Sequence, residues 1–265
     1  MKAPDFDYLR PPTLTAAIAL LVEHDGDAVA LAGGQSLMAM MNFRVAAPEA
    51  LIDLADVTEL QGITRLGDSL RIGAMTRYVE LAHAPEVRAD LPLLIMALPH
   101  IAHDAIRNRG TIGGSLALAD PAAEMPALML VLDATIEVAG PDGTRLIKAD
   151  DFFLGIYETA LASDELIVAV HIPVARPEQR FAFHELAQRH GDYALAGVAV
   201  AQSGAHVRIA FFGVADRAMR LRTLESALSN APDGAAVQAA LPLLDGIEFN
   251  GDTRASAGTR QRLAG

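Results

Sequence analysis

The chain has 265 residues, of which 52% are hydrophobic and 20% charged, a globular composition long enough for two or three subdomains. Its net charge of −12 argues against a nucleic-acid binder. The absence of cysteine removes disulfides, a thiolate nucleophile and any iron–sulfur or zinc site ligated by the chain's own thiolates. Redox chemistry would therefore need an organic cofactor, or metals held by another chain.

Neither a membrane span nor a secretion signal is expected. No run of 18 apolar residues is present. The opening MKAPDFDYLRPPT lacks the apolar core of a signal peptide. We therefore expect a cytoplasmic protein.

The first part of the chain predicts short strands alternating with helices. Residues 6–12 indicate an extended lead-in, because a proline disfavours helix in the residue before it. Thr13 or Thr15 is expected to cap a helix that runs to about Val22. A buried strand over 28–31, a helix over 36–41 and a strand over 51–54 are expected to follow.

The middle of the chain mixes apolar helices with alternating strands. Thr76 is expected to cap a helix that ends near Leu81, and Pro173 to stop a strand that begins at residue 165. Residues 152–161 indicate a helix or a loop. The other elements expected here are a strand over 69–75, helices over 91–98 and 125–132, and a hairpin with strands over 135–139 and 144–147.

The last part predicts strands followed by helices, after a linker over 174–179. The segment 250–265 is polar and weakly specified. The expected strands cover 181–187, 193–203 and 207–214, and the expected helices cover 221–229 and 235–244.

Two similar glycine boxes are the most informative local patterns. AGGQSL at 32–37 lies between a predicted strand and a predicted helix, an arrangement that aims free N–H groups at an anion. RGTIGGS at 109–115 places two glycines before a hydroxyl. Glycine lets the backbone approach a ligand closely. Two such boxes suggest two loops that close on one ligand, although ordinary glycine turns would give the same letters.

Several familiar motifs are absent. No G-x-G-x-x-G follows a strand, and neither a P-loop nor a G-x-S-x-G elbow occurs. HELAQRH at 184–190 resembles a zinc helix, but its histidines are six residues apart, not four. No metal site is expected in this chain.

Taken together, the boxes belong to a longer ordered pattern. AGGQSL at 32–37 precedes RNRGTIGGSLALADPAAEMPALML at 107–130 and FHELAQRHGDYALAGVAV at 183–200. With DFDYLRPPTLTAAIALL and MMNFRVAAPEALIDL, the pattern covers nearly the whole chain. The chain resembles the FAD-binding (medium) subunit of the molybdenum hydroxylases, which include carbon monoxide dehydrogenase, xanthine dehydrogenase and aldehyde oxidoreductases.

The resemblance implies an α+β protein with a flavin fold of the vanillyl-alcohol oxidase (PCMH) type. Two α/β subdomains, residues 1–54 and 55–177, would hold FAD between them. A C-terminal antiparallel α+β domain, residues 178–265, would cover the isoalloxazine side.

The resemblance also implies cofactor contacts in both boxes. The first would bind the diphosphate through backbone amides, and the hydroxyls of Thr111 and Ser115 in the second could donate to phosphate or ribitol oxygens. The residues concerned are Ala32, Gly33, Gly34, Gln35, Ser36 and Leu37, and then Thr111, Ile112, Gly113, Gly114 and Ser115.

Five further positions match cofactor contacts in the family. Ile101 would pack along the cofactor, and Ile167 against the adenine or the ring edge. Asp120 and Glu124 would lie near the ribose and adenine, although the dipole of a following helix alone would favour such carboxylates. Tyr193 would lie beside the isoalloxazine, to stack on it or gate it; an ordinary strand tyrosine is the simpler interpretation.

The chain departs from its relatives in two places. Glu185 stands where many relatives carry a lysine near the flavin, which puts the electrostatic role of that lysine in doubt. Relatives usually continue into a longer C-terminal helix after a segment like residues 259–264, whereas this sequence stops at Gly265, so we expect either a short last element or a trimmed sequence. Arg107 and Arg109 flank the second box and could meet a phosphate or a partner subunit, or be solvated loop charges.

The function implied by the resemblance is electron transfer. A large subunit with a molybdenum-pterin cofactor and a small subunit with [2Fe–2S] clusters would pass electrons to FAD here, in a dimer of heterotrimers. FAD would pass them to NAD⁺, a quinone, a carrier protein or O₂. No catalytic acid–base residue is expected in this chain. The alternatives are a self-sufficient flavin oxidoreductase with its own substrate and a non-enzymatic phosphate-binding or assembly module.

Overall fold

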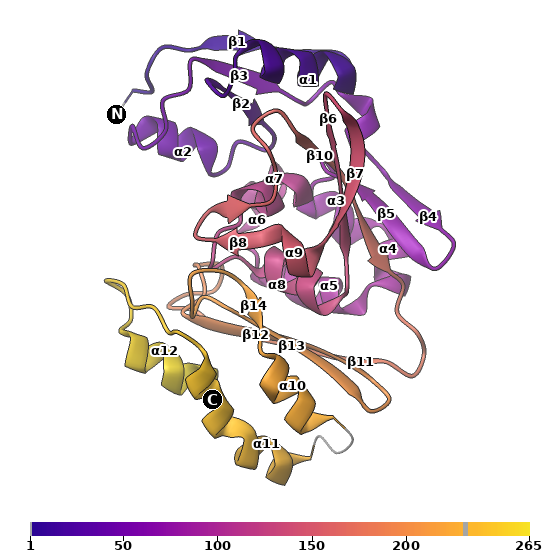
Figure 1. The fold of residues 1–265 in the computed structure, drawn as a ribbon, viewed down its shortest axis with the longest axis vertical. Helices are drawn as coiled ribbons and strands as arrows, with labels where there is room; N and C mark the ends of the chain where they lie inside the picture. The colour runs from indigo at the N-terminus through magenta and orange to yellow at the C-terminus, as the bar shows by residue number, and fades with distance from the viewer. Residues whose placement is uncertain (1, 230–232) are drawn as a thin grey trace.

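The computed structural model describes residues 2–229 and 233–265, and it is elongated (Figure 1). Within those residues the strands form three larger sheets and a two-stranded ribbon. Figure 1 shows the larger sheets following one another along the long axis in chain order. The α+β fold expected from the resemblance is confirmed.

The first sheet is parallel, in the order β1-β3-β2. Its predicted strands and helices are confirmed, and the extended lead-in contributes the edge strand β1. The Thr13 hydroxyl caps the first helix by accepting from the backbone N–H of Ala16 at 3.2 Å. The elements are β1 (Asp7–Leu9), α1 (Leu14–Glu23), β2 (Ala28–Leu31), α2 (Leu37–Asn42) and β3 (Ala50–Asp53).

The second sheet is antiparallel, in the order β4-β5-β10-β6-β7. Its strands are β4 (Ile63–Leu66), β5 (Ser69–Gly73), β6 (Thr135–Gly140), β7 (Gly143–Lys148) and β10 (Leu166–Pro173). Its helices are α3 (Tyr78–His83), α4 (Pro85–Asp90), α5 (Pro92–Ala97), α6 (Asp104–Arg107), α7 (Ile112–Leu118), α8 (Glu124–Val131) and α9 (Ala149–Phe152), with 3₁₀ turns at Thr58–Leu60 and Leu98–His100.

Three predictions for this region need correction. Arg77, not Thr76, is the N-cap of α3, where the Glu80 carboxylate accepts from the Arg77 N–H at 2.7 Å. Strand β4 was not expected. The segment 152–161, expected as a helix or a loop, begins with the last residue of a helix and contains two short strands joined by a turn, β8 (Phe153–Gly155) and β9 (Glu158–Thr159).

The third sheet is antiparallel, in the order β11-β12-β13-β14. The predicted strand over 193–203 begins only at Ala196, which leaves Tyr193 in a loop. The weakly specified C-terminal segment contains a helix whose cap, Ser256, accepts from the Thr259 N–H. The elements are β11 (Arg180–Leu186), β12 (Ala196–Ser203), β13 (His206–Phe212), β14 (Met219–Arg220), α10 (Arg222–Leu228), α11 (Gly234–Ala240), a 3₁₀ turn (Leu241–Gly246) and α12 (Ala257–Ala264).

Helix α8 joins the second sheet's layer to the third. All eight of its residues are buried, and it packs against β12 and β13. Such a helix has no polar face because it has protein on every side. We propose subdomain boundaries at 1–54, 55–177 and 178–265, each range containing one of the larger sheets.

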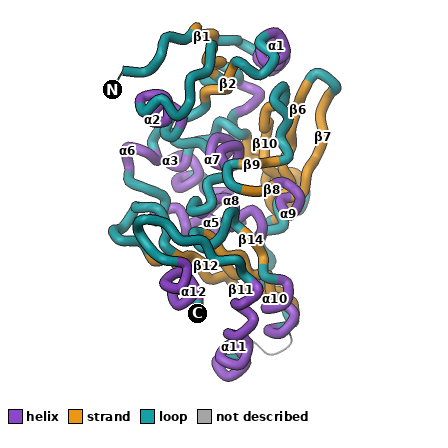
Figure 2. Tube along the Cα trace, turned by 60° about the vertical axis from the view of Figure 1, so that its left-hand side comes forward, coloured by secondary structure: helices purple, strands orange, loops and turns teal. Residues whose placement is uncertain are grey.

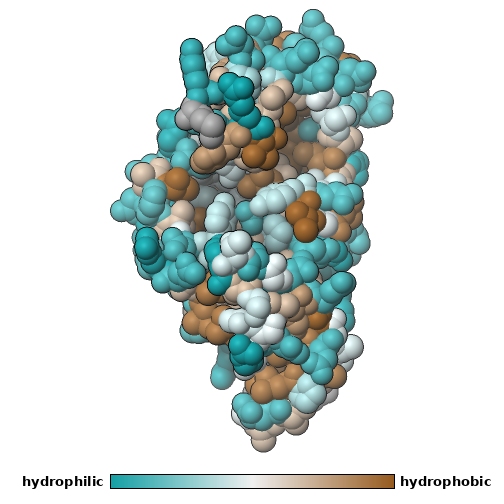
Figure 3. Space-filling model, turned by 90° about the vertical axis from the view of Figure 1, so that its left-hand side faces the viewer, coloured by the Kyte–Doolittle hydropathy of each residue, from teal (hydrophilic) through white to brown (hydrophobic). Residues whose placement is uncertain are grey.

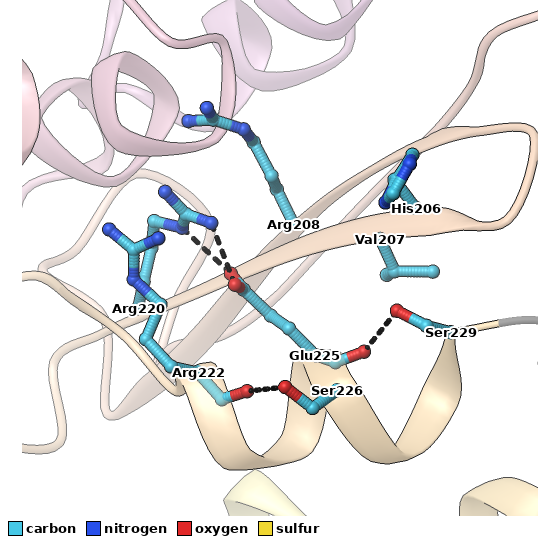
Figure 4. Close-up of a pocket in the computed structure, with 8 residues that line it drawn as sticks. All are labelled: His206, Val207, Arg208, Arg220, Arg222, Glu225, Ser226 and Ser229. Carbon is cyan, nitrogen blue, oxygen red and sulfur yellow. Dashed lines mark hydrogen bonds and ion pairs between the residues drawn. The ribbon is translucent and has the colours of Figure 1, made fainter.

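An ion-pair cluster reinforces the same joint (Figure 4). The Arg220 guanidinium donates to both Glu225 carboxylate oxygens at 2.7 Å and to Asp150 at 2.9 Å. Arg222 also donates to Asp150, and Arg208 pairs with Asp133 on the loop after α8. The cavity of about 360 Å³ beside these arginines is therefore no anion site, since their charges are already balanced by carboxylates.

We predict that Glu225→Ala destabilises the protein by about 3–5 kcal/mol, because it leaves the buried Arg220 without its bidentate partner and the Ile209 N–H without its acceptor. Chemical denaturation measures the change. The exposed Glu248 of the same domain provides the control, since Glu248→Ala should change stability by less than about 0.5 kcal/mol. Equal effects of the two substitutions would contradict a structural role for the cluster.

Candidate cofactor site

A cavity of about 1010 Å³ lies where the first subdomain meets α7 and α8. Figure 3 shows this side of the molecule, where the surface is hollowed and apolar side chains line the depression. The volume is at the upper limit for drug-sized ligands, so the cavity suits a larger molecule. Both glycine boxes line it, together with residues 188 and 191–193 of the loop before β12.

The first box presents free backbone donors to this cavity. Among the described residues, none of the N–H groups of residues 32–37 donates to a protein acceptor. The loop leaves β2 through Gly34, whose φ of +71° favours glycine, and enters α2. The Gln35 side chain steadies the loop by donating to the Gly33 carbonyl at 2.8 Å. Consecutive free amides of this kind form a binding surface for an anion.

The second box differs, because the amides of residues 112–115 are already used. The Ile112 and Gly113 N–H groups donate to the carbonyls of Thr76 and Ala74, at 3.0 and 2.8 Å. The Gly114 N–H donates to the Thr111 hydroxyl at 3.1 Å, and the Ser115 N–H to the Thr111 carbonyl at 3.2 Å. Of the N–H groups of residues 109–115, only that of Thr111 has no acceptor among the described residues, so this box offers a ligand mainly hydroxyls and close contact.

The two boxes also touch each other, which explains their glycines. A Cβ on Gly33 would collide with the backbone carbonyl of Arg109. A Cβ on Gly114 would lie 2.9 Å from the Thr111 hydroxyl and 3.3 Å from the Cβ of Ala32. The boxes are therefore built as one unit across the cavity floor.

Arg107 holds one wall of the cavity. Its guanidinium donates to the carbonyls of Ile101 and Ala102 at 2.8 and 2.9 Å and pairs with Asp104. It is thus committed to the protein and does not serve as a phosphate ligand. Gly191, with φ of +84°, packs on this wall, since a Cβ there would lie 2.5 Å from the Ala102 carbonyl oxygen. Residues 191–193 are held over the cavity by this contact.

A cluster of acids and phenols forms one end of the cavity. Helix α7 ends at Ala119 in the left-handed conformation, and Asp120 follows. The Asp120 carboxylate accepts from the Ala122 N–H at 2.8 Å and from the Tyr157 hydroxyl at 3.4 Å. Burial, followed by the charge of Asp120, raises the pKa of Tyr193 to about 12, so this phenol is neutral at physiological pH.

This clustering bears on one expectation, which stays a prediction. The resemblance assigned Asp120 and Glu124 to the adenine end of FAD but Tyr193 to the isoalloxazine. The structure brings all three together, since both carboxylates act on the pKa of Tyr193. They therefore line the same end of the cavity.

Two buried glutamates in this region hold protons unusually tightly. Glu124 is 7% exposed, and burial, with the nearby charge of Asp120, raises its pKa to about 7. The Glu185 side chain is 3% exposed, and burial, followed by repulsion from Glu124, raises its pKa to about 8. Its Oε2 atom has no hydrogen-bond partner among the described residues. Near neutral pH, both carboxyls are therefore partly protonated.

Every expected cofactor residue lines the cavity except Ile112, whose fully buried side chain belongs to the hydrophobic core. Several lining or covering residues were missed, and three are notable. Tyr78 lies within a helix that was predicted without a role in the site, and Tyr157 lies between β8 and β9, which were not predicted. Arg254 reaches the cavity from the weakly specified C-terminal segment. No group of three or more candidate metal ligands occurs in residues 2–229 or 233–265.

Comparisons with known proteins give the class. Residues 4–175 match the family model of the FAD binding domain in molybdopterin dehydrogenase, and residues 181–265 match that of the CO dehydrogenase flavoprotein C-terminal domain. The chain belongs to the family of FAD-binding subunits of the molybdenum hydroxylases. It is an oxidoreductase subunit whose cofactor is FAD, which confirms the resemblance. No helix in the described part of the chain is long and apolar enough to cross a membrane.

Individual relatives match this chain over its full length. The chain is 40% identical to the carbon monoxide dehydrogenase medium chain of Hydrogenophaga pseudoflava, with 100% of this chain and 95% of that protein covered. It is 36% identical to the caffeine dehydrogenase subunit beta of Pseudomonas sp. strain CBB1, with 100% and 92% covered.

Solved structures agree as well. Carbon monoxide dehydrogenase from Hydrogenophaga pseudoflava that lacks the Mo-pyranopterin moiety superimposes with a TM-score of 0.97 at 41% identity, with 100% and 94% covered. Quinoline 2-oxidoreductase from Pseudomonas putida 86 gives 0.93 at 39% identity, with 99% and 94% covered.

We predict that the buried carboxyls make the FAD-free protein less stable as pH rises from about 5 to 8. The folded state holds their protons up to a higher pH than the unfolded chain, in which the pKa of a glutamate is about 4.5, so deprotonation costs stability in this window. Glu185→Gln cannot ionise and should raise the melting temperature at pH 8 by roughly a few degrees, but not at pH 5. Thermal unfolding at both values tests this. A gain that is the same at pH 5 and pH 8 would contradict it.

Proposed function

We propose that the FAD diphosphate binds to the free amides of residues 32–37. The single observation that carries the proposal is that six consecutive N–H groups at the cavity surface lack acceptors among the described residues, while those of residues 112–115 have them. Unpaired backbone donors are costly unless water or a ligand accepts from them. Neutral amides can also hold a diphosphate in a chain of net charge −12 without needing lysines.

The other cavity residues then have distinct roles. Thr111 can donate its hydroxyl hydrogen while accepting from Gly114, and Ser115 offers a second hydroxyl to phosphate or ribitol oxygens. Ile101 and Ile167 provide apolar contact along the cofactor. Tyr193, held half-exposed over the cavity, would lie against the isoalloxazine, with Asp120 and Glu124 at the same end.

We propose electron transfer as the function of the subunit. FAD supplies the capacity to accept electrons and pass them on, and the chain supplies position, shielding from water and electrostatics. Electrons would come from [2Fe–2S] clusters of a small subunit and originate at a molybdenum-pterin cofactor on a large one, in a dimer of heterotrimers. NAD⁺, a quinone, a carrier protein or O₂ would receive them. The lack of cysteine and the full-length similarity to proteins named medium chains support this division of labour.

We predict that Gly33→Ala weakens FAD binding by at least about tenfold, because the new Cβ displaces the amide loop from the Arg109 carbonyl. The flavin absorbance of the purified protein measures occupancy. Gly258→Ala is the matched control: its Cβ would make only an ordinary contact with Arg262, and occupancy should stay unchanged. Full occupancy in Gly33→Ala would contradict the assignment of the loop.

We predict that Gly114→Val also lowers the FAD occupancy of the purified protein. The reason lies in contacts that only the structure shows. Gly114 has no positive φ, so backbone strain is not involved. The branched side chain would instead push away the Thr111 hydroxyl that caps α7 and crowd Ala32.

We predict that the isolated, FAD-loaded chain does not reduce its flavin when mixed with aldehydes, purines or other N-heterocycles. Addition of the metal-containing subunits should restore reduction. Stopped-flow absorbance of the flavin follows both reactions. Rapid reduction by a substrate in the isolated chain would favour a self-sufficient flavin oxidoreductase, and a chain that takes up no FAD would favour a phosphate-binding or assembly module.

A further inference from the structure

The loop between β9 and β10 forms one wall of the cofactor cavity. Six residues between 161 and 167 line the cavity, and the segment contains only a turn before β10 begins at Leu166. Leu166 shares an apolar cluster with Leu21 and Ala28 of the first subdomain, which line the cavity as well. Loops are more mobile than the elements they connect, so the shape of this wall depends on what holds the loop.

Arg145 on the edge strand β7 holds this loop from outside the cavity. Its Nε and Nη2 atoms donate to the two carboxylate oxygens of Glu165, each at 2.7 Å, and Nη2 also donates to the Ala160 carbonyl at 2.7 Å. The Glu165 carboxylate in turn accepts from the Ala162 N–H at 2.9 Å. One guanidinium and one carboxylate therefore fix the loop at three of its residues.

The geometry of this ion pair is precise although Arg145 lies at the surface. The Arg145 side chain is 48% exposed and the Glu165 side chain 13%. Surface ion pairs add little stability in general, but a bidentate pair of arginine and carboxylate fixes the orientation of both groups. Gly140 at the end of β6 leaves room for the pair, since a Cβ there would lie 2.9 Å from the Glu165 Cγ. The pair therefore matters more for the position of the loop than for global stability.

The loop marks the end of the cavity that lies farthest from Tyr193. Strand β10 begins beside the β6–β7 turn, because Leu166 pairs with Ala139, and Figure 1 shows this turn at the end of the second sheet nearest to the first. Tyr193 reaches the cavity from the third subdomain instead. If the diphosphate lies on residues 32–37 and the isoalloxazine beside Tyr193, the adenosine is left with the part of the cavity that residues 161–167 line.

We propose that Arg145 is a positioning residue that sets the preference of this site for FAD over FMN. Through Glu165 and Ala160 it holds the loop against the adenosine half of FAD, and Arg145 itself is not among the described residues that line the cavity. The inference rests on the proposed function, which puts the diphosphate and the isoalloxazine elsewhere in the cavity. FMN ends at its single phosphate and does not extend to the loop. A displaced loop should therefore weaken only ligands that carry an adenosine.

The test compares the affinities of FAD, ADP and FMN for the FAD-free full chain. Flavin fluorescence follows the binding of FAD and FMN, and competition with FAD follows that of ADP. Arg145→Met should raise the dissociation constants of FAD and ADP by at least about tenfold and leave that of FMN within about twofold. Arg145→Lys keeps the charge but not the bidentate geometry, so it should give a smaller loss in the same direction.

Arg65→Met is the matched control. Arg65 lies on β4, the other edge strand of the same sheet, and pairs with Asp90 at 2.6 Å. The side chains of that pair are 52% and 17% exposed, much as in the pair of Arg145 and Glu165. Neither Arg65 nor Asp90 is among the described residues that line the cavity, so FAD affinity should stay unchanged.

A double-mutant cycle gives a second, independent readout. Glu165→Gln keeps the shape of the side chain and should also weaken FAD and ADP but not FMN. Because Arg145 and Glu165 act as one unit, the double variant should bind FAD about as well as Arg145→Met alone. Additive losses would overturn the inference.

Two further results would also overturn it. One is an unchanged FAD affinity in both Arg145→Met and Glu165→Gln. The other is an equal loss for FMN, accompanied by an altered absorbance spectrum of the bound flavin, which would mean that the substitutions disturb the whole cavity. In these cases an unmodified chain that binds FAD leaves the proposed function standing, whereas an unmodified chain that binds no FAD overturns both.

Discussion

The structure depends on one unusual feature of the first glycine box: a run of backbone N–H groups with no acceptor in the part of the chain that the structure describes. In a folded chain such donors are nearly always paired, so residues 32–37 are organised for something that is not protein. Gly34 turns the chain out of β2, and Gln35 ties its own loop back to Gly33.

The second box supports the first because most of its own amides already have acceptors within the protein. The amides of residues 112–115 are used in capping α7 and in tying the loop to residues 74 and 76. It can therefore serve as a rigid floor, against which Gly33 packs backbone to backbone. One box supplies donors and the other supplies support. The rigidity extends through α7 to α8, whose eight buried residues tie the cavity to the third sheet.

Much of the fold and site was predictable because the signals were local. The strand, glycine loop and helix at 28–42 follow from apolar runs interrupted by glycines. The two glycine boxes that line the cavity could also be recognised in the sequence. The failures have physical causes. Strands β8 and β9 are two or three residues long and too short for periodicity to show. Helix α12 has little apolar pattern, and its cap bond and the Arg260 contacts to the Leu195 and Gly213 carbonyls hold it.

Other features depend on tertiary contacts and could not be predicted from local sequence. Ile112 lies in the middle of the second box, yet its side chain points into the core because the helix begins there. The end of the cavity to which Asp120 and Glu124 belong became clear only when the loop carrying Tyr193 was placed. The raised pKa of Glu185 depends on its burial in the folded protein and on Glu124, which is 61 residues earlier in the chain.

Hydrogen–deuterium exchange of the backbone amides, with and without FAD, tests the central claim most directly. The account predicts that the amides of residues 33–37 exchange rapidly in the FAD-free protein and become protected when FAD binds. Those of residues 112–115 should be slow in both states, since their acceptors belong to the protein. Bound FAD that leaves the exchange of residues 33–37 unchanged would contradict the account.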